Sequence, residues 1–261
     1  MTKRWSDLAS SNTSGNSFNA VIGADKHSGP YWTTGGFFSY GKNSYNGEGA
    51  TTTNNDYRLG LYGLFRNQAE EAVIYAGYGW QNNDTSRYFS AGDFYKATGD
   101  YKSHTIELGG RYAYDLDYQR QGGWHNKPFA GLRAVQYKQD SYSENGAGIW
   151  NLYTDDDSTC YSAATLGWGV SRSFSEGAVD FSVGYKRVLS GHDPYYSVGF
   201  ASLPGSSVDA DHNEQDRNLI VLGLSGEQKL KHNWFIGGNV AYECGGHDKV
   251  VTAGILLKKT W

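Results

Sequence analysis

The sequence predicts an all-β protein, a transmembrane antiparallel up-and-down β-barrel, and three observations support this. The 261 residues include 35 glycines, 21 tyrosines, 11 phenylalanines and 8 tryptophans, but only 4 prolines and 1 methionine. Mean hydropathy is −0.62, and no run approaches the roughly 18 consecutive apolar residues that a membrane-spanning helix needs. Apolar residues instead recur at every second position, as in strands with one face in lipid and one in a polar lumen.

The alternation is clearest in residues 105–116. One face of this segment holds Ile106, Leu108, Gly110, Tyr112, Tyr114 and Leu116, and the other holds Thr105, Glu107, Gly109, Arg111, Ala113 and Asp115. Charged residues opposite an apolar row indicate a barrel wall rather than a soluble sandwich. Aromatic residues end such rows, as Tyr78 and Trp80 do, which is typical of an interfacial girdle.

The same pattern predicts eleven strands. They lie near residues 17–25, 31–41, 56–66, 71–82, 102–116, 127–138, 160–172, 178–188, 217–228, 233–243 and 249–261. Single-chain bacterial barrels have even strand numbers, so a twelfth strand is expected within residues 1–14. We therefore divide the chain into 1–16, a junction or incomplete first strand, and 17–261, the barrel.

Connection lengths alternate, as they do in outer-membrane barrels with short periplasmic turns and long outer loops. The expected short links are 26–30, 67–70, 173–177 and 229–232, and the expected long loops are 42–55, 81–101, 139–159 and 189–216. The 117–126 link is of middling length and 244–248 forms a compact outer turn. This order predicts extracellular long loops and a C-terminus at the periplasmic side.

Ten charged residues fall on the inner faces of the expected strands. They are Arg58, Arg66, Glu107, Arg111, Asp115, Arg133, Asp180, Lys186, Glu227 and Glu243. They could accommodate a chain or helix in transit, but cross-strand pairing within a polar lumen is the default explanation, since inner charges most often serve such pairing. Inner glycines are expected to make room for bulky neighbours such as Tyr62 and Tyr75.

Other chemistry is weakly supported. Asp209, Asp211 and His212 in one long loop could serve a hydrolase at the barrel rim, but their spacing alone does not establish a catalytic geometry. Asp155, Asp156 and Asp157 lack the spaced oxygen ligands of a calcium loop. No zinc spacing, phosphate-binding loop or nucleophile elbow is present, so we expect no cofactor, no metal and no enzyme activity.

Charge and cysteine content narrow the partners. A net charge of −4 argues against nucleic acid. Cys160 and Cys244 fall on strands that are not neighbours, so free thiols are favoured over a disulfide between them. The polar segment 1–14 lacks the apolar core of a signal peptide, which is consistent with a mature or truncated piece of an exported protein.

Several segments together resemble the C-terminal translocator domain of autotransporters, the type V secretion system of Gram-negative bacteria. Residues 21–27 (VIGADKH) and 34–40 (TGGFFSY) are similar to the family's second and third strands, and 128–133 (PFAGLR) with 140–144 (DSYSE) to a middle strand and loop. The C-terminal third is most similar, through LGLSGE at 222–227, NWFIGG at 233–238 and Thr252, Gly254 and Trp261. Each piece is generic, so their order and spacing carry the resemblance.

The resemblance implies a 12-stranded monomeric barrel in the bacterial outer membrane that secretes or anchors its own passenger domain. It implies as partners this passenger, the barrel-assembly machinery, and outer-membrane lipid and lipopolysaccharide. The family's last strand carries an assembly signal, which Thr252, Gly254, Leu257 and Trp261 match in part, with Lys259 interrupting the apolar row. A passive porin is the first alternative and a rim-active hydrolase the second.

Overall fold

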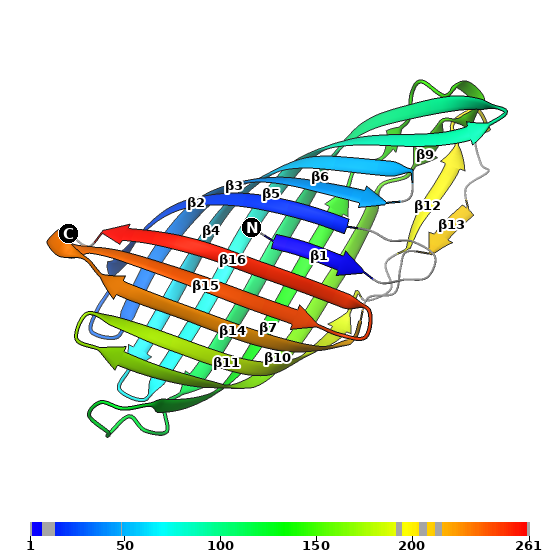
Figure 1. Ribbon diagram of the computed structural model, residues 1–261. Coiled ribbons are helices and arrows are strands. Elements are labelled where there is room, and N and C mark those ends of the chain that lie inside the picture. The colour runs from blue at the N-terminus through cyan, green and yellow to red at the C-terminus, as the bar shows by residue number, and fades with distance from the viewer. Residues whose placement is uncertain are drawn as a thin grey trace.

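A closed antiparallel barrel forms most of the molecule in the computed structural model (Figure 1). The structure describes residues 2–6, 14–47, 49–191, 195–203, 208–211 and 216–259. Within these residues the barrel contains twelve strands, arranged as β1-β16-β15-β14-β11-β10-β7-β6-β5-β4-β3-β2. The predicted fold class is therefore confirmed.

The barrel strands follow the predicted order, and most are longer than predicted. Their bounds are β1 Thr2–Ser6, β2 Ser14–His27, β3 Trp32–Gly47, β4 Ala50–Asn67, β5 Glu70–Ala91, β6 Asp93–Tyr114, β7 His125–Gln139, β10 Asp157–Phe174, β11 Gly177–Ser190, β14 Asn218–Lys229, β15 Trp234–Cys244 and β16 Asp248–Lys259. Neighbouring strands pair in antiparallel register throughout.

Strand β1 supplies the predicted twelfth strand and joins the two ends of the sheet. It pairs with β16 from Thr2 opposite Thr252 to Ser6 opposite Asp248, and with β2 from Thr2 opposite Ser17 to Trp5 opposite Ser14. Because closure gives each barrel strand a neighbour on both sides, it removes the free edge that an open sheet would present.

The two ends of the barrel differ in their connections. We call the end with the β2–β3, β4–β5, β6–β7, β10–β11 and β14–β15 links the turn end, and the opposite end the loop end. The short links were predicted correctly: only Gln68 and Ala69 separate β4 from β5, and only Ser175 and Glu176 separate β10 from β11.

Two of the predicted long loops are wrong, because their residues continue the barrel strands. Segment 42–55 belongs to β3 and β4, which pair as far as Gly47 opposite Ala50, and segment 81–101 belongs to β5 and β6, which pair as far as Ala91 opposite Asp93. These segments have no regular hydrophobic alternation. Their threonine, tyrosine and phenylalanine residues still favour extended structure, and the β5–β6 hairpin projects beyond the barrel (Figure 1).

A second, four-stranded sheet lies at the loop end (Figure 1). It consists of β8 Tyr142–Ser143, β9 Leu152–Thr154, β12 Tyr195–Phe200 and β13 Val208–Asp211, and a short 3-10 helix, η1 Gly148–Trp150, precedes β9. Arg87 on the β5–β6 hairpin donates to both carboxylate oxygens of the buried Glu144, at 3.1 and 2.6 Å. This bidentate pair fastens the hairpin to the β7–β10 connection.

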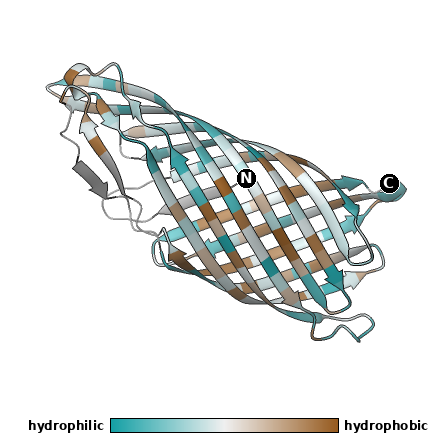
Figure 2. Ribbon diagram, turned by 180° about the vertical axis from the view of Figure 1, so that it is seen from behind, coloured by the Kyte–Doolittle hydropathy of each residue, from teal (hydrophilic) through white to brown (hydrophobic). Residues whose placement is uncertain are grey.

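The outer face of the barrel carries an apolar band between aromatic clusters. Leu61, Leu132 and Leu166 are 70%, 67% and 64% exposed, and brown segments recur along the middle of the strands in Figure 2. At the loop end the ring centroids of Tyr57 and Trp80 stack 5.7 Å apart; at the turn end those of Trp32 and Phe65 lie 5.3 Å apart.

Tyr57 and Phe65 lie eight residues apart on β4, which is about 26 Å along a strand. With a strand tilt of about 40°, this distance spans about 20 Å of membrane thickness, somewhat less than the apolar band of about 25 Å in outer-membrane barrels. In the described part of the chain, no helix has the length and apolar character needed to span a membrane.

Candidate functional site: the polar lumen

A continuous row of amide and hydroxyl side chains lines the inner face of β3 to β6 near the loop end. Asn43 donates to Asn54 at 2.6 Å, Asn54 to Asn83 at 3.1 Å, Asn83 to Ser103 at 3.0 Å, and Ser103 to Gln81 at 2.6 Å. All five residues are buried. Because each polar side chain has a partner, the row avoids the free-energy cost of unsatisfied buried groups.

The row continues into a charged cluster at mid-wall. Gln81 donates to Asp56 at 3.2 Å, and Arg58 donates to the same carboxylate at 2.7 Å. Glu107 then lies between two arginines: Arg133 Nε is 2.9 Å from Oε1, and Arg58 Nη1 is 3.6 Å from Oε2. Alternating charges therefore connect β4, β6 and β7 across the inner surface.

A second charged cluster lies nearer the turn end. Lys127 on β7 donates to Glu71 on β5 at 2.7 Å. Arg66 and Arg111 lie within electrostatic reach of Glu71, and Asp180 on β11 within reach of Lys127 and Arg111. The Arg111 guanidinium also lies 4.0 Å from the ring centroid of Phe129, a cation–π contact.

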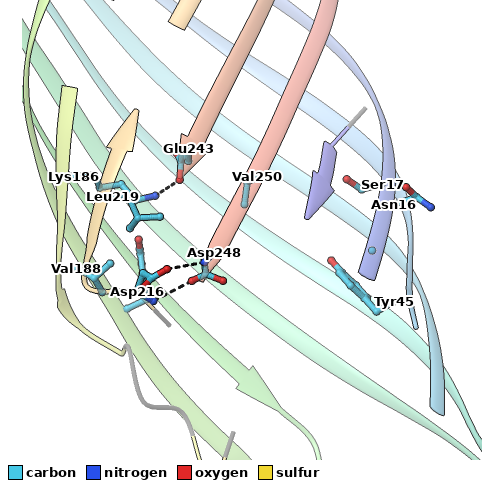
Figure 3. Close-up of a pocket in the computed structure, with 12 residues that line it drawn as sticks. Asn16, Ser17, Tyr45, Lys186, Val188, Asp216, Leu219, Glu243, Asp248 and Val250 are labelled. Carbon is cyan, nitrogen blue, oxygen red and sulfur yellow. Dashed lines mark hydrogen bonds and ion pairs between the residues drawn. The ribbon is translucent and has the colours of Figure 1, made fainter. Parts of the chain in front are cut away.

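Side chains from opposite walls narrow the lumen at the loop end, around a cavity of about 280 Å³. Figure 3 shows Lys186 and Glu243 on one side and Tyr45 on the other. Lys186 on β11 forms an ion pair with Glu243 on β15, reaching across β14. We call the three residues Tyr45, Lys186 and Glu243 the constriction.

Asp216 closes one rim of this cavity by joining two connections of the loop end. Its carboxylate accepts from the backbone N–H of His247 and of Asp248, both at 2.6 Å, and its own N–H donates to Asp248 at 3.0 Å. Burial alone raises the pKa of Asp216, but these two backbone donors and the nearby His247 outweigh it and lower the pKa. The ionised carboxylate thus holds the β15–β16 turn against the end of the β11–β14 connection.

The ten charged residues that were predicted to line the lumen differ in their contacts. Arg58, Glu107, Arg133, Lys186 and Glu243 form direct ion pairs. Asp115 directly follows the end of β6, at the turn end. It is buried, 2.8 Å from His125 Nδ1, and accepts from the N–H of Asp117 at 2.9 Å.

The β6–β7 link is thus organised by its own carboxylates. Asn126 donates to Asp117 through its side chain at 2.8 Å and its backbone at 3.0 Å, and these bonds lower the pKa of Asp117.

Glu227, another of the ten predicted luminal charges, is exposed on the inner face of β14, with no ion pair among the described residues.

The structure adds four residues that the sequence analysis omitted: Glu71, Lys127, Asp56 and His125. Strand alternation could have found three of them. Glu71 shares the face of Tyr75, Lys127 that of Arg133, and Asp56 that of Arg58. These three were missed because each is the first residue of its predicted strand. His125 has no local signal, since only the fold of the β6–β7 link brings it to Asp115.

Aromatic rings inside the barrel pack over glycines of neighbouring strands, as expected for Tyr62 and Tyr75. A Cβ added at Gly35 would lie 2.5 Å from Tyr62 Cζ, and one at Gly109 would overlap the Tyr75 ring. Phe37 over Gly60 and Phe129 over Gly167 repeat the arrangement. These glycines admit the rings that fill the wall's inner surface.

The structure describes some of the residues predicted for the assembly signal, the rim hydrolase and the cysteines. Thr252 and Gly254 lie on the inner face of β16 and Leu257 on its outer face, whereas Trp261 and His212 lie outside the described residues. Cys160 and Cys244 are free, as expected, on strands separated by β11 and β14.

The Asp155 carboxylate accepts a hydrogen bond from the Tyr153 hydroxyl. Across the ranges that the structure describes, no group of three or more His, Cys, Asp or Glu side chains could hold a metal ion.

A closed antiparallel barrel with an apolar outer belt, aromatic girdles and a polar lumen defines the class of outer-membrane β-barrels. Within that class, the model of the autotransporter beta-domain matches residues 1–241. The chain belongs to the autotransporter β-domain family, the membrane-embedded translocators of autotransporter proteins.

Two curated relatives, each named Esterase EstA, come from Pseudomonas aeruginosa and Pseudomonas putida. Each is 25% identical over 256 residues, which cover 93% of this chain and 38% of the relative. The chain thus spans little more than a third of the length of the curated relatives it matches.

Solved autotransporter structures share the fold. The translocator domain of NalP from Neisseria meningitidis has a TM-score of 0.80 at 15% identity, covering 98% of this chain and 84% of that one. The transport unit of AIDA-I from Escherichia coli has a TM-score of 0.70 at 17% identity, covering 100% and 88%. The beta domain of Bordetella BrkA has a TM-score of 0.60 at 13% identity, covering 99% and 95%.

Proposed function

We propose that this domain carries a passenger, joined upstream of β1, through its lumen to the cell surface and anchors it there. The continuous polar inner surface, from the amide row to the charged clusters, supports this proposal most directly. A chain in transit has unpaired backbone donors and acceptors, which a polar, hydrated passage can satisfy and an apolar one cannot. The domain itself needs no catalytic group or cofactor for this role.

The proposed orientation places the loop end outside the cell and the turn end, with the C-terminus, in the periplasm. The projecting β5–β6 hairpin and the second sheet would then face the medium, and the short turns the periplasm, as in outer-membrane barrels generally. Residues 1–16 would form both the junction with the passenger and the first strand, since they contribute β1 and the start of β2 to the barrel, and residues 17–261 would form the rest of the barrel.

The proposed partners follow from the same orientation. The barrel-assembly machinery would recognise the last strand through Thr252, Gly254, Leu257 and Trp261. Lys259 is compatible with that strand's outer face, since its ammonium lies 5.4 Å from the ring centroid of Trp234 and can reach lipid headgroups. The barrel would work as a monomer surrounded by outer-membrane lipid and lipopolysaccharide.

Fusion of a small reporter, preceded by a signal peptide, upstream of Met1 tests this function. We expect protease added to intact bacteria to remove the reporter, because the passenger reaches the surface. A fusion to the same chain lacking 249–261 provides the control and should leave the reporter protected. If the complete barrel folds in the membrane and the reporter stays in the periplasm, the translocator function is contradicted and a passive channel is favoured.

A further inference from the structure

An aromatic and basic band lies on the outer face of the barrel at the turn end, along neighbouring strands from β7 to β16. We define the basic rim as Arg172, Lys231 and Lys259 together with Trp124, Phe174 and Trp234. The barrel order places the ends of β10, β14, β15 and β16 on one side of the barrel. The β14–β15 turn contains the 3-10 helix η2 Lys231–Asn233 and projects on this side, beside the C-terminus (Figure 1).

Cations and exposed rings are in contact within the basic rim. The Arg172 guanidinium lies 5.2 Å from the ring centroid of Phe174 and 5.8 Å from that of Trp124. At the other end of the rim, Lys259 Nζ lies 5.4 Å from the ring centroid of Trp234. Phe174 and Trp124 remain 55% and 46% exposed, so the rings can enter a lipid interface while the cations remain beside it.

Acidic residues are few around this band. Among the described residues on the outer rim between β10 and β16, the exposed carboxylate belongs to Glu176 in the β10–β11 turn. The backbone carbonyl of Glu176 accepts a hydrogen bond from the N–H of Lys229. Glu227 faces the lumen instead. The adjoining sector of the turn end differs, because there Tyr112 on β6 donates to Glu70 on β5 at 2.9 Å and no cation covers that ring among the described residues.

We propose that the basic rim binds the headgroup of an anionic phospholipid in the adjoining membrane leaflet. This inference rests on the proposed membrane function. Tryptophan and tyrosine rings settle at the headgroup level, and lysine and arginine beside them extend their charged ends to headgroup phosphates. Because the adjoining β5–β6 sector pairs its aromatic Tyr112 with the acid Glu70, the barrel would bind anionic lipid at the basic rim in preference to that sector.

Native mass spectrometry of the folded chain in a nonionic detergent tests this inference. Phosphatidylglycerol would be titrated against the unaltered protein and against Arg172→Gln/Lys259→Gln. Because each basic residue near a lipid surface strengthens binding about five-fold, we expect the apparent Kd of the first phosphatidylglycerol to rise about 30-fold when two are removed. Phosphatidylcholine should bind both proteins alike.

The matched control is Lys229→Gln/Lys258→Gln, which removes two charges at the same end. These lysines flank Phe235 on the luminal face, where Lys258 Nζ lies 6.0 Å from its ring centroid. Unchanged phosphatidylglycerol affinity is expected for this control. An equal loss in both double variants, or none in the rim variant, overturns the inference. Export of the fused reporter by the rim variant reports separately on the proposed function.

Discussion

Replacement of Glu107 by alanine is expected to lower the free energy of unfolding of the barrel by about 1–3 kcal/mol. This loss is smaller than that expected for breaking a fully buried ion pair, because both arginines are partly exposed. Glu107 is 16% exposed and contacts Arg133 and Arg58, which are 48% and 37% exposed. Its removal leaves two guanidinium groups facing the same site. Arg58 keeps Asp56 as a partner, but Arg133 loses its carboxylate.

Urea unfolding of the barrel in lipid vesicles, followed by tryptophan fluorescence, measures this effect. Glu227→Ala is the matched control, since it also removes a carboxylate from the inner wall but breaks no ion pair recorded for the described residues. We expect less than about 0.5 kcal/mol for that variant, as for most surface changes. Glu107→Gln/Arg133→Gln should recover part of the stability. If Glu107→Ala and Glu227→Ala unfold alike, the ion cluster does not stabilise the wall.

Gly109→Ala is expected to destabilise the barrel by about 1–3 kcal/mol through overpacking. The added methyl group would overlap the ring of Tyr75 on β5. The ring can relieve the overlap only by leaving its place over the β6 backbone. We expect a lower midpoint in the same urea assay and a smaller fraction of barrel that resists unfolding in SDS without heating.

The control for this substitution lies on the adjacent strand. A Cβ at Gly77 would meet only the Leu59 carbonyl oxygen, at an ordinary 3.6 Å, so Gly77→Ala should be nearly neutral. Combining Gly109→Ala with Tyr75→Ala removes the overlapping ring, and the two effects should then not add. Simple additivity, or equal destabilisation by the two glycine substitutions, would show that ring-over-glycine packing is unimportant.

Strand alternation predicted the barrel core because lipid on one side and water on the other impose a two-residue period. Residues such as Leu108 and Glu107 therefore fall on opposite faces, as the wall requires. Beyond the apolar band both faces meet water, so Asn54 and Asn83 give no periodic signal although they pair in the structure. The lengths of β3 to β6 consequently could not be predicted from hydropathy.

Which side chains pair inside the lumen was harder to predict than which side chains face it. The pairing of Lys186 with Glu243 crosses an intervening strand, and the contact between Asp115 and His125 depends on the shape of a ten-residue link. Both are long-range consequences of closure and loop conformation. Alternation assigns a side chain to a face, whereas register and loop geometry decide which residue it meets.

Site-specific photocrosslinking during export tests the central claim, passage of the passenger through the lumen, most directly. A crosslinking amino acid would replace Tyr45 at the constriction or Leu132 on the lipid-facing wall, in cells exporting a reporter stalled by a stable fold. Adducts with the reporter are predicted from position 45 and not from position 132. A reporter that reaches the surface without forming adducts at position 45, or forms them equally from both positions, would contradict passage through this lumen.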